Sequence, residues 1–382
     1  MAKRLLALII CFFMITPLVS QAAEQNAVGS ASVSSPNQKT PEKSADEALT
    51  AAEFTAKLGC GMNLGNSLDA AHMLQYNPNM SLAEYEKSWG NPLIAKEQFT
   101  AIYAAGFQTV RIPVSWDEHM TADGTIKTDF LNRVQEVVDM ALAGGLYVII
   151  DTHHEDWLNL DLDKQAEITA RFANVWKQIA VRFQAYDERL VFEGLNEPRL
   201  KNSSHEWTGG TTELQAFVNV LNETFVTTVR SVGGKNALRF LMVCPYCHRV
   251  EEDALKALKL PDDERLIVAV HLYEPSGFCL DANASRSWNT TVNNNELQTM
   301  EKKFSLLKKY FVSQNIPVVI TEFGCMDKGN LPDRACWTRD FVKCCHDAGV
   351  SYLWWDNGGD FRILNRETGE FLYPEIVKVL TE

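Results

Sequence analysis

Two glutamates, Glu197 and Glu322, have a setting that suggests chemistry, because each follows a largely apolar run of the chain. Residues 191–195 lead to the first glutamate and residues 318–320 lead to the second. A carboxylate at the end of such a run is expected to lose contact with water, and that cost is usually met by a functional reason. A buried structural ion pair is the alternative for either residue.

Two carboxylates of this kind can cut a glycosidic bond. One protonates the leaving oxygen while the other attacks the anomeric carbon. Their surroundings must differ, because the acid needs a raised pKa and the nucleophile a low one. Arg111 is a candidate partner for an ionised nucleophile, and Tyr273 is a candidate hydrogen-bond donor to the same carboxylate. Asn196 is suited to bind a sugar 2-hydroxyl, and for Arg111 an internal salt bridge is the alternative.

The same region also contains the residue types of a metal-dependent hydrolase. His153, His154 and His271, together with nearby carboxylates, could ligate an ion. Adjacent histidines at a strand end are expected to point to opposite sides, so His153 and His154 should not share one ion. The first predicted strand also lacks a His-x-His pair. We therefore predict a site without metal or other cofactor.

The elements that must position these residues are short apolar runs separated by segments with helical period. Such alternation predicts an α/β fold, and eight units are the number that closes a single (β/α)8 TIM barrel. An open doubly wound sheet is the alternative, but the glycines after the first run lack dinucleotide-loop spacing. The predicted strands are 58–64, 109–114, 147–152, 190–195, 239–243, 266–272, 318–323 and 351–355.

A barrel of this kind carries its catalytic groups at the carboxyl ends of the strands. Unusual polar residues lie on or just after predicted strands two, three, four, six, seven and eight, which would gather them at one mouth. They are Arg111, the segment 151–155, Asn196 and Glu197, His271 and Tyr273, Glu322, and Trp355 with the two residues after it.

The composition argues against several classes of ligand. The 382 residues carry a formal net charge of −13 and contain no basic block, which disfavours nucleic acid, anionic polymers and anionic membranes. A neutral polymer meets no such penalty. Nine Trp and ten Tyr supply flat apolar faces, most of which should be buried in the core while some can stack on sugars.

The N-terminal residues have the pattern of an export signal. Lys3 and Arg4 precede an apolar run over 5–19 and a small-x-small site at 20–22. We predict a signal peptide over 1–22, a flexible polar leader over 23–49 and a catalytic domain over 50–382. An uncleaved anchor is the alternative, but the run is short for a span of ~20 residues. The expected product is a secreted or periplasmic protein, monomeric and without stable membrane insertion.

Eight cysteines remain after the predicted cleavage, and export would permit disulfides whose connectivity the sequence does not reveal. Cys244 and Cys247 have the spacing of a redox or zinc motif. No second Cys or His pair stands at zinc spacing, so small apolar residues or a structural bridge are the better interpretation.

Taken in order, the motifs resemble glycoside hydrolase family 5, the large cellulase family of retaining (β/α)8 enzymes. The resemblance covers nearly all of residues 50–382. Its opening motif and the Trp-Trp-Asp-Asn-Gly segment look most like the subfamily 4 endoglucanases, which act on β-1,4-glucans, including mixed-linkage glucan and xyloglucan. The matching segments are 61–69, 89–92, 106–116, 151–155, 195–198, 271–273, 321–324 and 354–358.

The resemblance implies a role for each matching residue. Glu197, preceded by Asn196, matches the acid/base and Glu322 matches the nucleophile. Trp355 matches the aromatic platform under the sugar on the non-reducing side of the cut. Residues that match the surroundings of the pair are Arg111, His153, His271 and Tyr273, and residues in loops resembling the glycone-side lining are Asn66, Trp89 and His154.

Substrate choice stays open between β-linked glycans at this point. The main expectation is an endo-β-1,4-glucanase acting on a β-glucan polymer or oligosaccharide. An endo-β-mannanase would share both carboxylates, and a non-catalytic carbohydrate-binding barrel is the alternative from another class. One departure from the family pattern is the segment 244–248, where Gly- and Ala-rich sequence is commoner, and it leaves the shape of the leaving-group side open.

Overall fold

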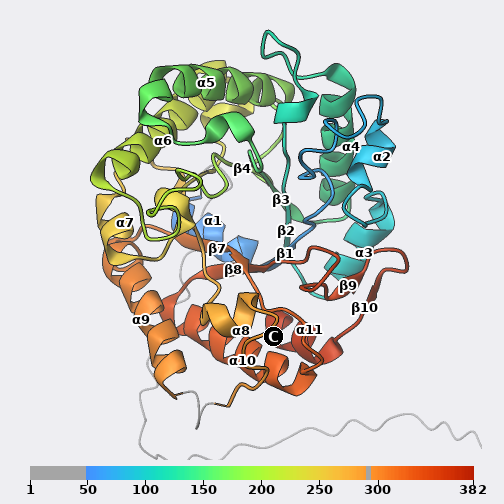
Figure 1. Cartoon of the computed structure of the whole chain (residues 1–382), viewed down its shortest axis with the longest axis vertical. Helices are drawn as coiled ribbons and strands as arrows, with labels where there is room; N and C mark the ends of the chain where they lie inside the picture. The colour runs from blue at the N-terminus through green and yellow to red at the C-terminus, as the bar shows by residue number, and fades with distance from the viewer. Residues whose placement is uncertain (1–48, 290–293) are drawn as a thin grey trace, which may run out of the picture. The chain divides into compact units, whose positions relative to one another are not determined.

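The computed structural model describes residues 49–289 and 294–382, which form one closed barrel of parallel strands surrounded by helices (Figure 1). The predicted signal peptide and nearly all of the predicted leader lie outside the described residues. The strands pair in chain order, and the last pairs back with the first, which confirms the predicted (β/α)8 fold. They are β1 (Cys60–Asn63), β2 (Thr109–Ile112), β3 (Tyr147–Ile150), β4 (Leu190–Glu193), β5 (Leu241–Val243), β6 (Leu266–His271), β7 (Val318–Phe323) and β8 (Ser351–Trp354).

All eight strands lie inside the predicted ranges, and six of them end one or two residues earlier than predicted. The second strand, for example, was expected to reach residue 114 and pairs with its neighbours only to Ile112. The polar residues that follow therefore belong to loops at the mouth of the barrel, where their side chains are free of strand alternation.

The helices pack against the outside of the barrel through one apolar face each. In α4, the buried side chains recur at helical spacing and include Phe130, Val134 and Val138. The helices are α1 (Ala51–Leu58), α2 (Leu82–Glu86), α3 (Lys96–Ala104), α4 (Thr128–Ala143), α5 (Gln165–Arg182), α6 (Thr212–Val232), α7 (Glu252–Ala257), α8 (Ser276–Leu280), α9 (Asn294–Tyr310), α10 (Leu331–Ala348) and α11 (Pro374–Thr381). A separate hairpin is formed by β9 (Leu364–Asn365) and β10 (Glu370–Phe371).

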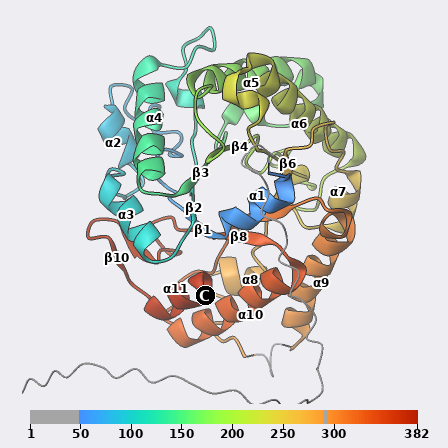
Figure 2. The same cartoon turned by 180° about the vertical axis from the view of Figure 1, so that it is seen from behind.

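The interior of the barrel is filled by apolar side chains up to the level of the site. This cluster includes Ile149, Val191, Met242, Ile267 and Val319, one or more from each of several strands. Helix α1 crosses the amino-terminal end of the barrel (Figure 2) and adds its own apolar side chains to the same cluster. The closed lower end leaves the carboxyl ends of the strands as the open mouth.

The first helix is held in this place by a cap and an aromatic stack. Thr50 caps α1 and exchanges hydrogen bonds with Glu53, which satisfies backbone groups at the start of the helix. The ring of Phe54 stacks on that of Phe240, with centroids 3.8 Å apart and planes 10° from parallel. Phe54 is fully buried, so the contact seals the bottom of the barrel.

The cysteines of the described chain are free thiols, and all but Cys336 are buried. Burial raises the pKa of Cys244 and Cys247 well above the usual value for a thiol. These two residues therefore behave as small apolar groups, which is one of the two interpretations left open by their spacing. Within residues 49–289 and 294–382, no helix has the length and apolar character that a membrane span requires.

Candidate active site

A cavity of about 330 Å³ opens at the carboxyl ends of the strands and contains both candidate carboxylates. Most of the predicted site residues line it, and Arg111 lies directly beneath them, fully buried. The lining residues are His153, His154, Asn196, Glu197, Trp207, Cys247, Arg249, His271, Tyr273, Ser276, Leu280, Glu322, Trp355 and Phe361.

The two glutamates are joined by one imidazole. Nδ1 of His271 lies 3.0 Å from Oε1 of Glu197 and 3.5 Å from Oε2 of Glu322. Carboxylate oxygens of the two residues lie within 4.8 Å of each other. This separation suits direct attack by one carboxylate on a bond protonated by the other, for which ~5–5.5 Å is usual. The wider spacing of ~6.5–9.5 Å needed to admit a water is not present between this pair.

Strand register explains why His271 and Glu322 meet. The two residues are Cα partners on β6 and β7, immediately after an irregularity in the ladder at Val270 and His271. An extra residue of this kind re-aims the following side chains, and such irregularities are common beside active sites. Both side chains consequently turn into the mouth of the barrel.

Arg111 on β2 is the positive centre beneath the pair. Its Nη1 donates to Oε1 of Glu322 at 2.8 Å, and its Nε donates to Glu193 at 2.5 Å. Nη2 donates to Asp151 at 2.7 Å and to Oδ1 of Asn196 at 2.9 Å. The alternatives considered for Arg111 thus hold together: it is an internal salt bridge and also a partner of the candidate nucleophile.

This cluster contains more carboxylates than cations, and burial acts on each of them. Burial raises the pKa of Glu322 to about 8 and that of Asp151 to about 7, although Arg111 opposes both shifts. For Glu193 the balance is reversed: burial would raise its pKa, but Arg111 and His248 together hold it below the usual range. Glu193 is thus the carboxylate whose charge Arg111 stabilises most, and the raised pKa of Glu322 differs from the low pKa expected of a nucleophile, because burial outweighs its hydrogen-bond donors.

Tyr273 and His153 complete the environment of the pair. The hydroxyl of Tyr273 donates to Oε2 of Glu322 at 3.0 Å. Nδ1 of His153 forms a hydrogen bond of 2.7 Å with Oδ2 of Asp151. Burial lowers the pKa of this imidazole to about 3. A neutral ring at this place can hydrogen-bond a sugar hydroxyl without adding charge.

Trp355, which the resemblance matches to a sugar platform, forms one wall of the cavity. Its ring lies parallel to that of His153, with centroids 5.8 Å apart and 4° between the planes. Gly65 passes so close to the indole that a Cβ there would lie 2.5 Å from a ring carbon. A glycine is therefore required next to this wall.

Three predicted glycone-side residues have different positions. His154 lines the cavity and Trp89 lies behind it, with ring centroids 5.7 Å apart. Asn66 is not among the cavity's lining residues. It adopts a positive φ of 59°, its N–H donates to Asp69, and its carbonyl accepts from Asn91 at 2.8 Å. Trp89 and Asn66 are thus the two predicted glycone-side residues that do not line this cavity.

The expectation that His153 and His154 point to opposite sides is wrong. Both line the same cavity, with ring centroids 4.4 Å apart. The rule failed because β3 ends at Ile150, so strand alternation no longer applies. Together with Asp69 they could offer three ligand atoms to an ion.

Two further groups have possible ligand atoms close together, Glu193 with His248 and His271, and Glu197 with His271 and Glu322. In the first group Nε2 of His248 is paired with Glu193, and in the second Nδ1 of His271 is paired with Glu197 while Arg111 supplies positive charge at Glu322. Nε2 of His271 has no hydrogen-bond partner in the described residues.

Sequence reasoning missed a group of residues beside Glu197. Nη1 of Arg199 lies 3.3 Å from Oε2 of Glu197 and donates to its carbonyl at 2.9 Å. The same guanidinium lies 4.3 Å from the ring centre of Trp207, whose side chain is about half exposed at the cavity rim. The only signal for Arg199 in the sequence was its position two residues after Glu197. Trp207 lies in a loop whose course the sequence did not predict.

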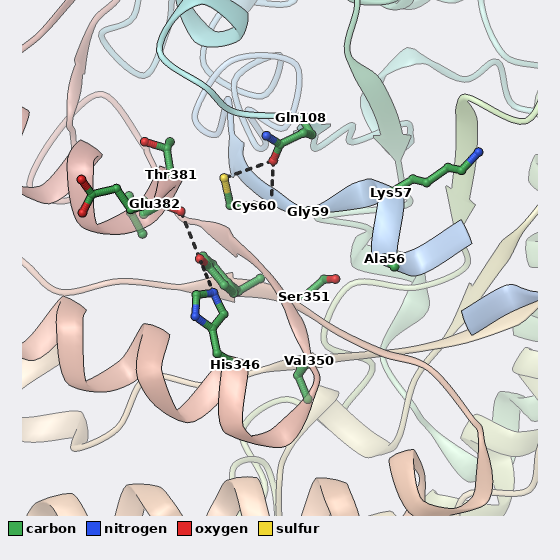
Figure 3. A pocket seen from close by; sticks show the side chains of 12 residues that line it. Ala56, Lys57, Gly59, Cys60, Gln108, His346, Val350, Ser351, Thr381 and Glu382 are labelled. Atoms are coloured by element: carbon green, nitrogen blue, oxygen red, sulfur yellow. Dashed lines mark hydrogen bonds between the residues drawn. The ribbon is translucent and has the colours of Figure 1, made fainter. Parts of the chain in front are cut away.

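A second cavity, of about 390 Å³, lies at the amino-terminal ends of the strands (Figure 3). Cys60 and Gln108 contact each other on one side, and His346 and Ser351 border the other. The larger cavity therefore does not contain the carboxylate pair, and we place the candidate active site in the smaller one.

Known proteins resemble the chain over most of its length. Residues 73–361 match the family described as cellulase (glycosyl hydrolase family 5). Endoglucanase A of Clostridium longisporum is 36% identical over 339 residues, covering 87% of this chain and 65% of that relative, slightly under two thirds of its length.

Solved structures resemble the chain over most of its length. The GH5-4 broad specificity endoglucanase from Ruminococcus champanellensis with bound cellotriose has a TM-score of 0.84 at 34% identity, covering 89% of this chain and 100% of that one. XEG5A, a GH5 xyloglucan-specific endo-β-1,4-glucanase from a metagenomic library, in complex with cellotriose, has a TM-score of 0.79 at 38% identity. That match covers 84% of this chain and 95% of the other.

Proposed function

The chain belongs to glycosyl hydrolase family 5, and we propose that it is a secreted, retaining endo-β-1,4-glucanase with Glu197 as acid/base and Glu322 as nucleophile. The observation that carries the proposal is the arrangement of the two glutamates around His271, with carboxylate oxygens within 4.8 Å. This spacing leaves room for a scissile bond between them but not for a water behind the sugar.

The proposed reaction has two steps. Glu322 attacks the anomeric carbon while Glu197 gives its proton to the leaving oxygen, so an ester to Glu322 forms as the glycosidic bond breaks. Glu197 then takes a proton from a water that attacks the same carbon and releases Glu322. The hydrogen bonds from Arg111 and Tyr273 stabilise the negative charge that Glu322 carries before the first step and recovers after the second.

Asn196 and Trp355 are proposed to hold the sugar on the non-reducing side. Oδ1 of Asn196 accepts from Arg111, which fixes the amide and leaves its Nδ2 directed near His153 at 3.4 Å. An amide donor there is suited to a sugar 2-hydroxyl, whose hydrogen bond strengthens in the transition state. Trp355 offers an apolar face for stacking on the pyranose ring.

A neutral β-1,4-glucan is the proposed substrate class. The net charge of −13 disfavours anionic polymers, and the cavity wall combines an aromatic face with uncharged hydrogen-bonding groups. The resemblance to a broad specificity endoglucanase and to a xyloglucan-specific one supports cellulosic, mixed-linkage or branched glucan as the candidates.

Product analysis tests the activity and its substrate. The purified chain should release oligosaccharides from carboxymethylcellulose, barley glucan or xyloglucan, and NMR of early products should detect the β-anomer. Release from mannan alone would reject the glucanase assignment. An initial α-anomer would reject the retaining mechanism, and binding to all glucans without any product would indicate a non-catalytic barrel.

Azide distinguishes the two proposed roles. With 2,4-dinitrophenyl β-cellobioside, Glu322→Ala should be inactive and, with azide, should yield an α-glycosyl azide, because azide replaces the nucleophile in a single inversion. Glu197→Ala should instead yield a β-glycosyl azide, because azide replaces the second-step water. Near-normal hydrolysis of barley glucan by Glu322→Ala would show that the assignment is wrong.

Secretion is proposed from the N-terminal residues alone. Lys3 and Arg4, the apolar run over 5–19 and the small residues at 20–22 support cleavage after Ala22. Expression of the full chain followed by N-terminal sequencing of the exported protein should find residue 23 first. Retention of residues 1–22 in a membrane fraction would indicate an anchor instead.

A further inference from the structure

The segment after β5 forms a support beneath the acid/base turn. Residues 244–248 contain the short 3-10 helix Tyr246–His248, and three hydrogen bonds connect this helix to the turn at 197–200. Cys247 donates its N–H to the carbonyl of Pro198 at 2.9 Å, and the hydroxyl of Tyr246 accepts from the N–H of Leu200 at 3.1 Å. The third bond joins the N–H of Glu197 to Nδ1 of His248 at 3.1 Å.

Backbone conformation on both sides of the third bond is unusual. Glu197 has a φ of 46°, and Cys247 and His248 have φ values of 51° and 54°. These are residues with a Cβ in the left-handed region, which costs free energy and persists only where the surroundings hold it. The hydrogen bond from the N–H of Glu197 to the ring of His248 therefore links two residues that both have a strained backbone.

The other ring nitrogen of His248 connects this support to the charged cluster. Nε2 lies 3.2 Å from Oε1 of Glu193, and the second oxygen of Glu193 accepts from Arg111. Because the N–H of Glu197 can only donate, Nδ1 must be an acceptor and the ring proton must be on Nε2. A neutral, Nε2-protonated His248 is thus the form that satisfies both neighbours.

A chain of hydrogen bonds then connects the two catalytic glutamates through buried residues. It runs from the N–H of Glu197 through His248, Glu193 and Arg111 to the carboxylate of Glu322. His248 is fully buried, so solvent cannot replace either of its hydrogen bonds. The carboxylate of Glu197 has its own partners in His271 and Arg199, and the hydrogen bond to His248 comes from the backbone of Glu197. The ring of His248 also packs against that of His271, with centroids 4.2 Å apart.

We propose that His248 is a positioning residue for the acid/base: it holds the strained backbone of Glu197 through Nδ1 and fixes that bond to the Arg111 cluster through Nε2. The inference rests on the proposed function and adds a determinant of proton delivery to the leaving group. Its loss should matter most when the leaving group needs a proton and least when it does not.

Substitution of His248 by Asn or by Gln tests the hydrogen bonds of its two ring nitrogens one at a time. In His248→Asn the amide reaches the position of Nδ1 and can accept from Glu197, whereas in His248→Gln it reaches the position of Nε2 and can serve Glu193 only. Thr321→Val is the matched control, because Thr321 donates to the same oxygen of Glu193 at 2.9 Å without contacting Glu197.

The measurement compares kcat/KM for phenyl β-cellobioside, which needs protonation, with that for 2,4-dinitrophenyl β-cellobioside, which does not. For His248→Gln we expect a loss of about 10- to 100-fold on the phenyl substrate and less than about 3-fold on the dinitrophenyl one. His248→Asn keeps the bond to Glu197 and loses only the one to Glu193, so its loss on the phenyl substrate should be smaller than that of His248→Gln. Thr321→Val should lose equally on both substrates or not at all.

Equal losses on the two substrates for His248→Gln, or no loss on either, would overturn the inference. If that variant does not fold, NMR of the wild type decides, because an Nδ1-protonated or doubly protonated His248 would also overturn it. Failure of the wild type to cleave either cellobioside would instead contradict the proposed function, so the two failures are distinguishable.

Discussion

The hydroxyl of Tyr273 donates a hydrogen bond of 3.0 Å to Oε2 of Glu322, on the opposite oxygen from the one held by Arg111. Each oxygen of the candidate nucleophile therefore has one donor, and both donors favour the ionised form. The first prediction uses a substitution of Tyr273 by Phe, which removes the hydroxyl donor and keeps the aromatic ring.

Tyr273→Phe should raise the pKa of Glu322, because one hydrogen bond to its charged form is lost. A nucleophile must be ionised, so the acid limb of the kcat/KM profile on phenyl β-cellobioside should move to higher pH. The loss at neutral pH should be about 10- to 100-fold, the size expected for a hydrogen bond to a charged group. Tyr186→Phe, which removes a surface bond to Asp139, is the control, and the same change in both variants would contradict the argument.

The pH profile of the wild type should follow the ionisation of Glu322. Burial raises the pKa of Glu322 to about 8, although the hydrogen bonds from Arg111 and Tyr273 oppose the shift. A nucleophile must be ionised, so the rate should increase as Glu322 loses its proton. For 2,4-dinitrophenyl β-cellobioside, which needs no proton from the protein, kcat/KM should therefore rise with pH through about 8 and level off above it.

Glu197→Gln provides the matching control for this profile. The charge of Glu197 raises the pKa of Glu322, so its removal should lower that pKa. With the dinitrophenyl substrate, activity should therefore persist to lower pH than in the wild type. An acid limb that stays in place would mean that the charge of Glu197 does not act on Glu322.

Much of the barrel and of its catalytic pair could be predicted from the sequence for a physical reason. A parallel strand covered on both faces is a nearly continuous apolar run, so the run that precedes Glu322 indicates both a strand and the point where it ends. The carboxyl ends of all strands meet at one mouth, which brought Glu197 and Glu322 together without knowledge of any loop.

Sequence reasoning missed site residues that do not directly follow an apolar strand. Glu193 lies inside an apolar run on β4, and nothing in that run indicated that its side chain would pair with Arg111. Trp207 reaches the cavity from a loop, and His248 lies beside the site in a short 3-10 helix with a left-handed backbone that the sequence did not indicate. Their positions depend on packing between distant segments.

Gly65 should be required for the sugar platform. A methyl group there would lie 2.5 Å from the ring of Trp355, and the displaced indole would lose its position for stacking. We expect Gly65→Ala to lower kcat/KM for cellotetraose by about 10-fold or more, given ~1–2 kcal/mol for such an aromatic contact. Gly277→Ala is the control, because its added Cβ would meet Ala284 at an ordinary 3.7 Å. Unchanged kinetics in Gly65→Ala would argue against a platform role for Trp355.

Phe54 should affect stability without affecting the chemistry. It is fully buried, stacks on Phe240 and belongs to the apolar cluster at the opposite end of the barrel from the carboxylates. Phe54→Ala should cost about 3–5 kcal/mol of unfolding free energy, through lost burial and a cavity that the barrel cannot close. Urea unfolding followed by tryptophan fluorescence gives this value.

The same variant, assayed at 25 °C where it is still folded, should keep its kcat/KM within about 3-fold, because the site is built on the carboxyl ends of the strands. Leu238→Ala, with a side chain 59% exposed, is the control and should change stability by less than about 0.5 kcal/mol. A large loss of kcat/KM in folded Phe54→Ala would mean that the lower end of the barrel holds Arg111 and its carboxylates in place, and that stability and activity are joined through the barrel interior.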